Sequence, residues 1–269
     1  MTLLLRHGDW DEVTPATAGW HYLSFRVLRL DGRASFETGG DEVVIVPLSG
    51  DARVEAEGGE WDVGGRAHVF EALPRSLYLP RDTSVELTGV AELALCCARA
   101  ERRREVRAIP PDEVEIEVRG SGNATRQISH IVKPEFPAER ILVVEVYTPA
   151  GNWSSYPPHK HDEERGELEA VLEETYYFRT RPDPPGAFAV QRLYGSDLDL
   201  TETVRDGDLL QVPHGYHTTA AAHGYDLYYL NALAGDRRTM QAADDPDLAW
   251  IRPAWGELEP DPRVPMVDR

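Results

Sequence analysis

The pair His159 and His161, separated by Lys160, is the segment whose residue types most directly suggest chemistry. On a β-strand, alternate residues share a face, so the two imidazoles would converge on one point while Lys160 faces away. Imidazole pairs presented in this way suit Zn²⁺, Fe²⁺, Mn²⁺, Ni²⁺ or Cu²⁺. Taken alone, the motif is also compatible with a solvent-exposed pair that binds no metal.

Two later segments could complete such a site. The run that starts at Glu173 and Glu174 is rich in tyrosine, and a strand-borne carboxylate there would balance the charge of a cation. Glu174 is the better candidate because it shares strand parity with Tyr176 and Phe178, although Glu173 stays possible. The segment 207–217 then forms a turn that leads to His217 on the next strand.

The elements that must position these residues are short strands. Apolar or alternating runs recur along the chain, and each ends at Gly, Pro or Asp. Many short strands at this spacing predict an all-β fold, either a sandwich or a barrel. The expected strands are Tyr22–Leu30, Glu42–Leu48, Arg53–Glu57, Ser76–Leu79, Ser84–Thr88, Ala91–Ala98, Arg126–Val132, Arg140–Tyr147, Glu174–Arg179, Ala189–Tyr194, Asp208–Val212 and Asp226–Leu233.

The two halves of the chain show a faint internal repeat. The turn after Leu79 resembles the turn after Val212, since in both an apolar strand runs into a proline and a second strand soon begins. We therefore predict two related barrels, a first in residues 1–108 and a second in residues 109–269, with the Arg-rich stretch 99–111 at their junction. Past Gly235, the aromatic residues of a polar, Pro-rich tail would pack that tail onto the second barrel.

Composition narrows the functional classes. The chain has 269 residues, with 28 Lys and Arg against 47 Asp and Glu, which gives a net charge of −19. A field of this sign disfavours partners such as nucleic acid and anionic membranes. The two cysteines, Cys96 and Cys97, are adjacent, and neither a secretion signal nor an 18-residue apolar span is recognisable. These features indicate a cytoplasmic protein.

In its second half the sequence resembles the cupins. Gly151, the His159/His161 pair, a later Glu on a Tyr-rich strand, a Gly-x5-Pro-x-Gly turn and a final His resemble the two cupin motifs. The resemblance implies two tandem cupin barrels, with one divalent ion held by His159, His161, Glu174 and His217. Zinc is favoured, and manganese, iron and nickel are compatible with the same donors. His217 is preferred to His214 because His214 lies in the turn.

The departures from the common cupin pattern fit a narrower family. The Pro157–Asp162 and Leu172–Phe178 segments, His214-Gly215-Tyr216-His217 and the run Gly224–Asn231 resemble the 5-deoxy-glucuronate isomerases of myo-inositol breakdown. That family is bicupin, with metal in the C-terminal barrel only. Consistently, Ser84 stands where His217 stands in the repeat, and no His-x-His pair precedes it.

The resemblance implies an aldose–ketose isomerase that acts on a small sugar acid. The alternatives are an isomerase of another uronate, of the 5-dehydro-4-deoxy-glucuronate type, an iron-dependent cupin dioxygenase and a non-catalytic sugar-binding cupin. The sequence does not single out a general base, and a homo-oligomer is compatible with it. As substrate-binding residues we expect two tyrosines, a histidine donor and an arginine for the substrate carboxylate, namely Tyr176, Tyr229, His214, and Arg126 or Arg179.

Overall fold

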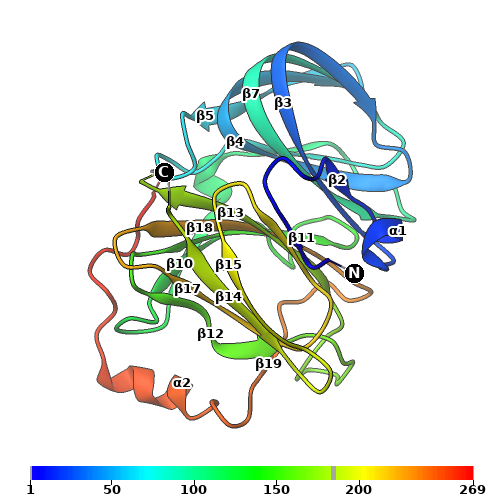
Figure 1. Ribbon diagram of the computed structural model, residues 1–269. Coiled ribbons are helices and arrows are strands. Elements are labelled where there is room, and N and C mark those ends of the chain that lie inside the picture. The colour runs from blue at the N-terminus through cyan, green and yellow to red at the C-terminus, as the bar shows by residue number, and fades with distance from the viewer. Residues whose placement is uncertain (1, 183–185, 269) are drawn as a thin grey trace.

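The computed structural model describes residues 2–182 and 186–268 as two β-barrels packed side by side, with short helical turns. Figure 1 shows the first barrel in blue and cyan and the second in green to orange, with a red tail that runs along the second barrel. Strands dominate the described residues, and this confirms the predicted all-β fold. No helix in the described ranges is long and apolar enough to cross a membrane.

The first barrel is a single antiparallel sheet in the order β2-β3-β7-β4-β6-β8, with β5 paired to β4. Its interior is filled by aliphatic side chains such as Ile45, Val54 and Leu87. Its strands are β2 (Glu12–Val13), β3 (Leu23–Glu37), β4 (Asp41–Ala56), β5 (Gly59–Arg66), β6 (Ser76–Leu79), β7 (Ser84–Arg99) and β8 (Arg107–Ile109).

Two pairs of predicted strands are joined in the structure. Ser84–Thr88 and Ala91–Ala98 form the single strand β7, and Glu42–Leu48 and Arg53–Glu57 belong to the single strand β4. The two strands approach closely where they bend, because a Cβ on Gly89 would lie 2.4 Å from the carbonyl oxygen of Asp51. Glycine at this position is therefore part of a bent strand, and the sequence pattern had indicated a break.

The second barrel consists of two facing sheets. The first has the order β1-β16-β13-β18-β11-β10-β9, and the second has the order β15-β14-β17-β12-β19. The first sheet contains β1 (Leu4–Leu5), β9 (Glu115–Arg119), β10 (Arg126–Val132), β11 (Ile141–Thr148), β13 (Glu173–Arg181), β16 (Leu209–Val212) and β18 (Asp226–Ala234). The second contains β12 (Trp153–Lys160), β14 (Ala189–Tyr194), β15 (Asp199–Val204), β17 (Tyr216–Ala221) and β19 (Ala243–Asp244).

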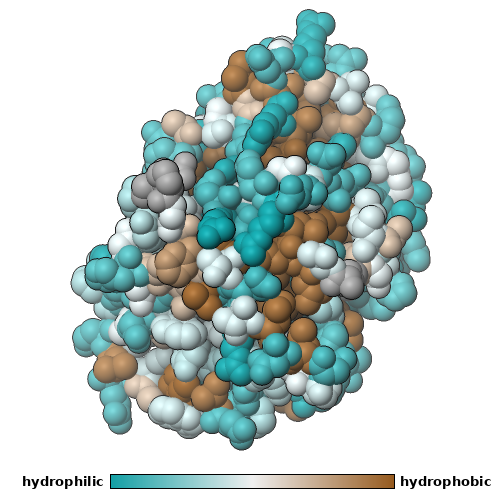
Figure 2. Space-filling view, viewed as in Figure 1, coloured by the Kyte–Doolittle hydropathy of each residue, from teal (hydrophilic) through white to brown (hydrophobic). Residues whose placement is uncertain are grey.

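The two barrels share a buried boundary. An aromatic cluster that includes Phe25 of β3 and Tyr177 of β13 spans it, with ring centroids 5.7 Å apart. The buried carboxylate of Glu42 accepts hydrogen bonds from the backbone amides of Arg140 and Ile141, at 2.6 and 2.8 Å. The buried carboxylate of Glu42 is therefore paired, as burial requires. Outside it, Figure 2 shows a mostly hydrophilic face with an apolar area near the middle.

The chain crosses the boundary at its N-terminal end. β1 pairs with β16 of the second barrel, with Leu4 opposite Leu210, although the following strands belong to the first barrel. The first sheet ends with β8 and the next strand, β9, begins the second barrel. The division at residues 108 and 109 stays a prediction. The short helices are α1 (Pro15–Ala18), η1 (Pro111–Glu113), α2 (Ile251–Ala254) and η2 (Trp255–Glu257).

Candidate metal centre

Three strands of the second barrel bring together the four residues expected to bind metal. His159 lies near the end of β12 and is directly opposite His217 of β17 in the antiparallel register. His161 follows the last residue of β12, and Glu174 is the second residue of β13, in the other sheet. The residues therefore meet between the two sheets.

The ligand atoms of His161, Glu174 and His217 all lie within 4.8 Å of one another, so these three side chains form a group that could hold a metal ion. The Oε2 atom of Glu174 is 2.9 Å from Nε2 of His161 and 3.4 Å from Nε2 of His217. His159 lies at the rim of this group, with its ring centroid 4.5 Å from that of His217.

The Nδ1 atoms of His161 and His217 face backbone carbonyl groups, and this leaves the Nε2 atoms of both rings directed at Glu174. Nδ1 of His161 donates to the carbonyl oxygen of Leu172 at 2.9 Å, which makes Nε2 the atom with a free lone pair in the neutral ring. Nε2 of the fully buried His217 has no hydrogen-bond partner among residues 2–182 and 186–268. A buried nitrogen without a partner is costly, and a cation beside it would remove the cost.

The environment also keeps two of the imidazoles neutral. Burial, together with the nearby His161, lowers the pKa of His159 to about 3. Burial and the neighbouring His159 lower the pKa of His217 to about 3. Burial is also the largest influence on His161 and acts in the same direction, but the hydrogen bond and charge attraction to Glu174, together with backbone hydrogen bonds, outweigh it and raise the pKa. The neutral rings of His159 and His217 have lone pairs available at neutral pH, and together with His161 and the carboxylate of Glu174 they fit a divalent transition metal.

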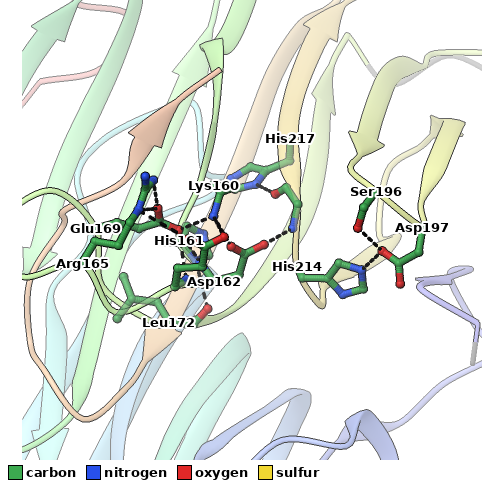
Figure 3. A network of polar contacts seen from close by, with 12 residues as sticks. Lys160, His161, Asp162, Arg165, Glu169, Leu172, Ser196, Asp197, His214 and His217 are labelled. Carbon is green, nitrogen blue, oxygen red and sulfur yellow. Dashed lines mark hydrogen bonds and ion pairs between the residues drawn. The ribbon is translucent and has the colours of Figure 1, made fainter. Parts of the chain in front are cut away.

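An acidic loop, residues 162–172, encloses one side of the group (Figure 3). Its acidic residues are not all solvated, since Glu169 is fully buried and accepts a 2.9 Å hydrogen bond from Nζ of Lys160. Asp162 also pairs with Lys160 and accepts a 2.6 Å hydrogen bond from the backbone amide of Gly215, just before β17. These contacts connect the strand of His159 to the turn that precedes His217.

A cavity of about 100 Å³ opens beside the histidines. Its wall has a cationic part, made of guanidinium groups, and an apolar part, and it includes three of the four expected ligands. The lining residues are Arg119, Arg126, His159, His161, Leu172, Glu174, Leu233, Met240, Ala242 and Arg252. This combination of cations, apolar surface and metal ligands suits a small organic anion.

Only one of the residues that were expected to contact substrate lines this cavity. Arg126 lines the cavity, but Tyr176 and Tyr229 are buried in the barrel interior, where both hydroxyls hydrogen-bond Ser155 at 3.2 Å. His214 is exposed, and its Nε2 lies 3.0 Å from Asp197, on the outer side of the turn in Figure 3.

Arg179 lies on the opposite face of β13, toward the first barrel. Its guanidinium pairs with Glu92 and with Asp206 and lines a separate cavity of about 370 Å³. The side chain of Glu173 faces the same way, since its carboxylate accepts hydrogen bonds from the backbone amides of Tyr22 and Leu23 at 2.9 and 2.8 Å. Strand parity, which favoured Glu174, also separates Arg179 from the cavity.

Sequence reasoning missed several residues of the cavity wall. Arg119, Leu172, Leu233 and Arg252 come from four separate segments, and no short motif connects them. Arg252 arrives through the C-terminal tail, which had been expected only to pack on the barrel. In the structure, Asp244 of β19 pairs with His159 and so places the tail beside the metal ligands, a contact that no sequence pattern indicated.

The chain is similar to known proteins over most of its length. Residues 5–251 match the KduI/IolB family. A 5-deoxy-glucuronate isomerase of Geobacillus thermodenitrificans is 43% identical over 252 residues, covering 91% of each chain. The solved structure of an IolB-like protein from Salmonella typhimurium has a TM-score of 0.89 and 37% identity, and the match covers 93% of this chain and 99% of that one.

A more distant match concerns the fold alone. Bacillus subtilis oxalate decarboxylase, which has Mn(II) centres, gives a TM-score of 0.63 at 14% identity, over 90% of this chain and 79% of that one. Matches of this kind confirm the predicted bicupin architecture. With a family match over most of its length and a close relative covered almost completely, this chain belongs to the KduI/IolB family.

Proposed function

We propose that this protein is a 5-deoxy-glucuronate isomerase that converts its substrate to 5-dehydro-2-deoxy-gluconate with the help of one divalent ion. The observation that carries the proposal is the convergence of His161, Glu174 and His217 beside a cation-lined cavity. The names of the relatives supply the substrate, since they match over about nine-tenths of both chains.

His159, His161, Glu174 and His217 are the proposed ligands of the ion, and zinc is the favoured metal. An aldose–ketose isomerisation moves a proton between C1 and C2 and passes through a species with enediolate charge. A bound divalent ion would supply Lewis-acid stabilisation of that charge. The protein supplies the fixed positions of the donors, since His161 is oriented by Leu172 and all but His159 are buried.

The apolar side of the cavity fits the deoxy carbon of this substrate. Leu172, Leu233 and Met240 offer no hydrogen-bond partner to a hydroxyl group at that position. A methylene group has no hydrogen bonds to water that it could lose on entering this environment. A hydroxyl group would lose its hydrogen bonds to water without replacement.

The sister activity on 5-dehydro-4-deoxy-glucuronate would use similar ligands, but the relatives found here carry the name of the first activity. A dioxygenase would need a redox-active metal and O₂. A sugar-binding protein without activity would not need an ion with open positions. The partner implied by the proposal is a small sugar acid, and we retain the expectation of a cytoplasmic protein, with which a homo-oligomer is compatible.

The test combines metal analysis with an isotope experiment. Purified protein is loaded with Zn²⁺ and incubated anaerobically with 5-deoxy-glucuronate in D₂O, and the products are followed by NMR. We expect about one ion per chain, formation of the ketose and deuterium at the carbon that receives the proton. Turnover only with O₂ would favour the dioxygenase, and turnover only of 5-dehydro-4-deoxy-glucuronate would favour the sister isomerase. Binding of sugar acids without any turnover would refute the enzyme.

A further inference from the structure

We propose that Arg126 is the residue that receives the carboxylate of the substrate, and that the tail strand β19 and the helical turns α2 and η2 hold it ready for this role. The inference rests on the proposed function only for the identity of the acid. It is built on three observations, namely the free donors of Arg126, the charge balance of the cavity and the packing of the tail.

Arg126 is the first residue of β10 and is only 3% exposed. Its recorded hydrogen bonds both come from Nη1, which donates to the carbonyl oxygens of Ala124 and Tyr156 at 3.1 Å. Nε and Nη2 have no protein acceptor in the part of the chain that the structure describes. A guanidinium fork with two free donors beside a cavity is suited to a carboxylate, which can accept both at once.

The charges around the cavity single out the same residue. Arg119 forms a two-fold hydrogen bond with Glu117, at 2.7 and 2.8 Å, and Arg252 pairs with both oxygens of Asp244. Arg126 forms no ion pair with any carboxylate among the described residues. Of the three guanidinium groups in the wall, it therefore carries the one charge that no anion among the described residues balances.

A buried and unbalanced charge is expensive. Although burial lowers the pKa of Arg126 to about 10, the group is still charged at neutral pH. Proteins rarely bury such a cation without a partner, because transfer out of water costs several kcal/mol. An anionic ligand that enters the cavity would offset that cost, and binding would favour an acid over a neutral sugar of the same shape.

The tail fixes the position of Arg126. Asp244 of β19 is paired with His159, and the chain then leads to Arg252 in α2 and Trp255 in η2. The guanidinium of Arg126 lies 5.7 Å from the ring centroid of Trp255, and that of Arg252 lies 5.4 Å from it on the same ring system. Contact with an aromatic face restrains a guanidinium without neutralising it.

The test compares two substrates in two proteins. One substrate is 5-deoxy-glucuronate, and the other is the same sugar with a hydroxymethyl group in place of the carboxylate. In the Arg126→Met variant we expect kcat/KM for the acid to fall about 100-fold, mainly through KM, because a charge-assisted hydrogen bond is lost. For the neutral sugar we expect a change of less than about three-fold, because its hydroxymethyl group makes no charge-assisted bond that the variant could lose.

Arg192→Met is the matched control, since Arg192 lies on β14, is half exposed and its loss changes the net charge equally. Arg126→Lys keeps the charge without the fork and should recover part of the loss. If Arg126→Met does not fold, Trp255→Leu replaces it and should raise KM for the acid alone. An equal loss for both sugars, with metal content unchanged, would overturn the proposal while the isomerase stands.

Failure of the proposed function would give a different result. If the wild-type protein turns over no sugar acid, calorimetry measures the binding of D-glucuronate to the wild type and to Arg126→Met. Each protein is measured with Zn²⁺ and without metal. Binding that is lost in Arg126→Met supports the anion site in spite of the missing activity. Equal binding by the wild type and Arg126→Met, or binding by neither of them, refutes the anion site.

Discussion

The guanidinium of Arg66, at the end of β5, and the carboxylate of Glu145, on β11, lie 2.5 Å apart with both side chains completely buried. Each belongs to a different barrel, and Tyr228 also donates to Glu145 at 2.8 Å. Buried ion pairs of this kind contribute little net stability but are costly to break, because the remaining charge stays unpaired.

We therefore expect Arg66→Met to lower the free energy of unfolding by about 3–5 kcal/mol. The double variant Arg66→Met with Glu145→Gln should recover part of this loss, since no buried charge is left. Urea denaturation of the three proteins at pH 7 measures both effects. A single variant as stable as the wild type would show that the pair does not hold the barrels together.

Removal of His161 should separate metal binding from folding. We expect His161→Ala to reduce metal affinity by more than the ~10–100-fold that changes outside the ligand set cost, and to abolish turnover. Its circular dichroism spectrum should be unchanged, because the ring contributes no strand pairing. The exposed His223 provides the control His223→Ala. Full metal content in the His161 variant would contradict the ligand assignment.

Loss of the buried carboxylate of Glu169 should weaken metal binding, although Glu169 is not one of the proposed ligands. Glu169 accepts hydrogen bonds from Lys160 and from the amides of Asp162 and Glu163, and the loop ends at Leu172, the acceptor for His161. Glu169→Gln should weaken metal binding about 10-fold and speed amide exchange in residues 162–172. Metal titration and hydrogen-exchange mass spectrometry test this, and Glu167→Gln in the same loop is the control.

A polar group on the apolar side of the cavity should change substrate selectivity. Met240 lines that side with Leu233. Met240→Gln offers a partner to a hydroxyl, so the preference for 5-deoxy-glucuronate over glucuronate should fall by about 10-fold. The ratio of kcat/KM for the two acids is the measurement. An unchanged ratio would mean that the deoxy carbon does not face Met240.

The adjacent cysteines predict how stability depends on alkaline pH. Burial raises the pKa of the Cys97 thiol to about 12, from an ordinary value of 9. The folded state therefore keeps its proton between pH 9 and 12, where the unfolded state loses it, so stability falls as the pH rises through this range. A thiol reagent at pH 8.5 should leave the buried Cys96 unlabelled in the native protein, should label the partly buried Cys97 slowly, and should label both rapidly in guanidinium. Rapid labelling of Cys96 in the native protein would contradict its buried position.

The residues of the site that could be predicted from the sequence are those whose positions follow from their spacing along a single strand. The separation of His159 from His161, and the parity that links Glu174 to Tyr176, placed these residues on the correct side of their strands. Parity also separates Arg179 from Glu174, and stricter use of it would have directed Arg179 toward the first barrel. The cavity wall depends on contacts between distant segments, such as Arg126 with Trp255, and a single sequence does not encode these in any local pattern.

The short strand β1 limits how this protein can be made or divided. Leu4 cannot meet Leu210 until some two hundred further residues have left the ribosome, so the start of the chain stays unpaired during most of its synthesis. A gene cut at the junction between the barrels would remove that strand from the fragment that needs it. The exposed edge of β16 would then be free to pair with another molecule, and aggregation would follow from the missing strand even where the barrel itself is intact.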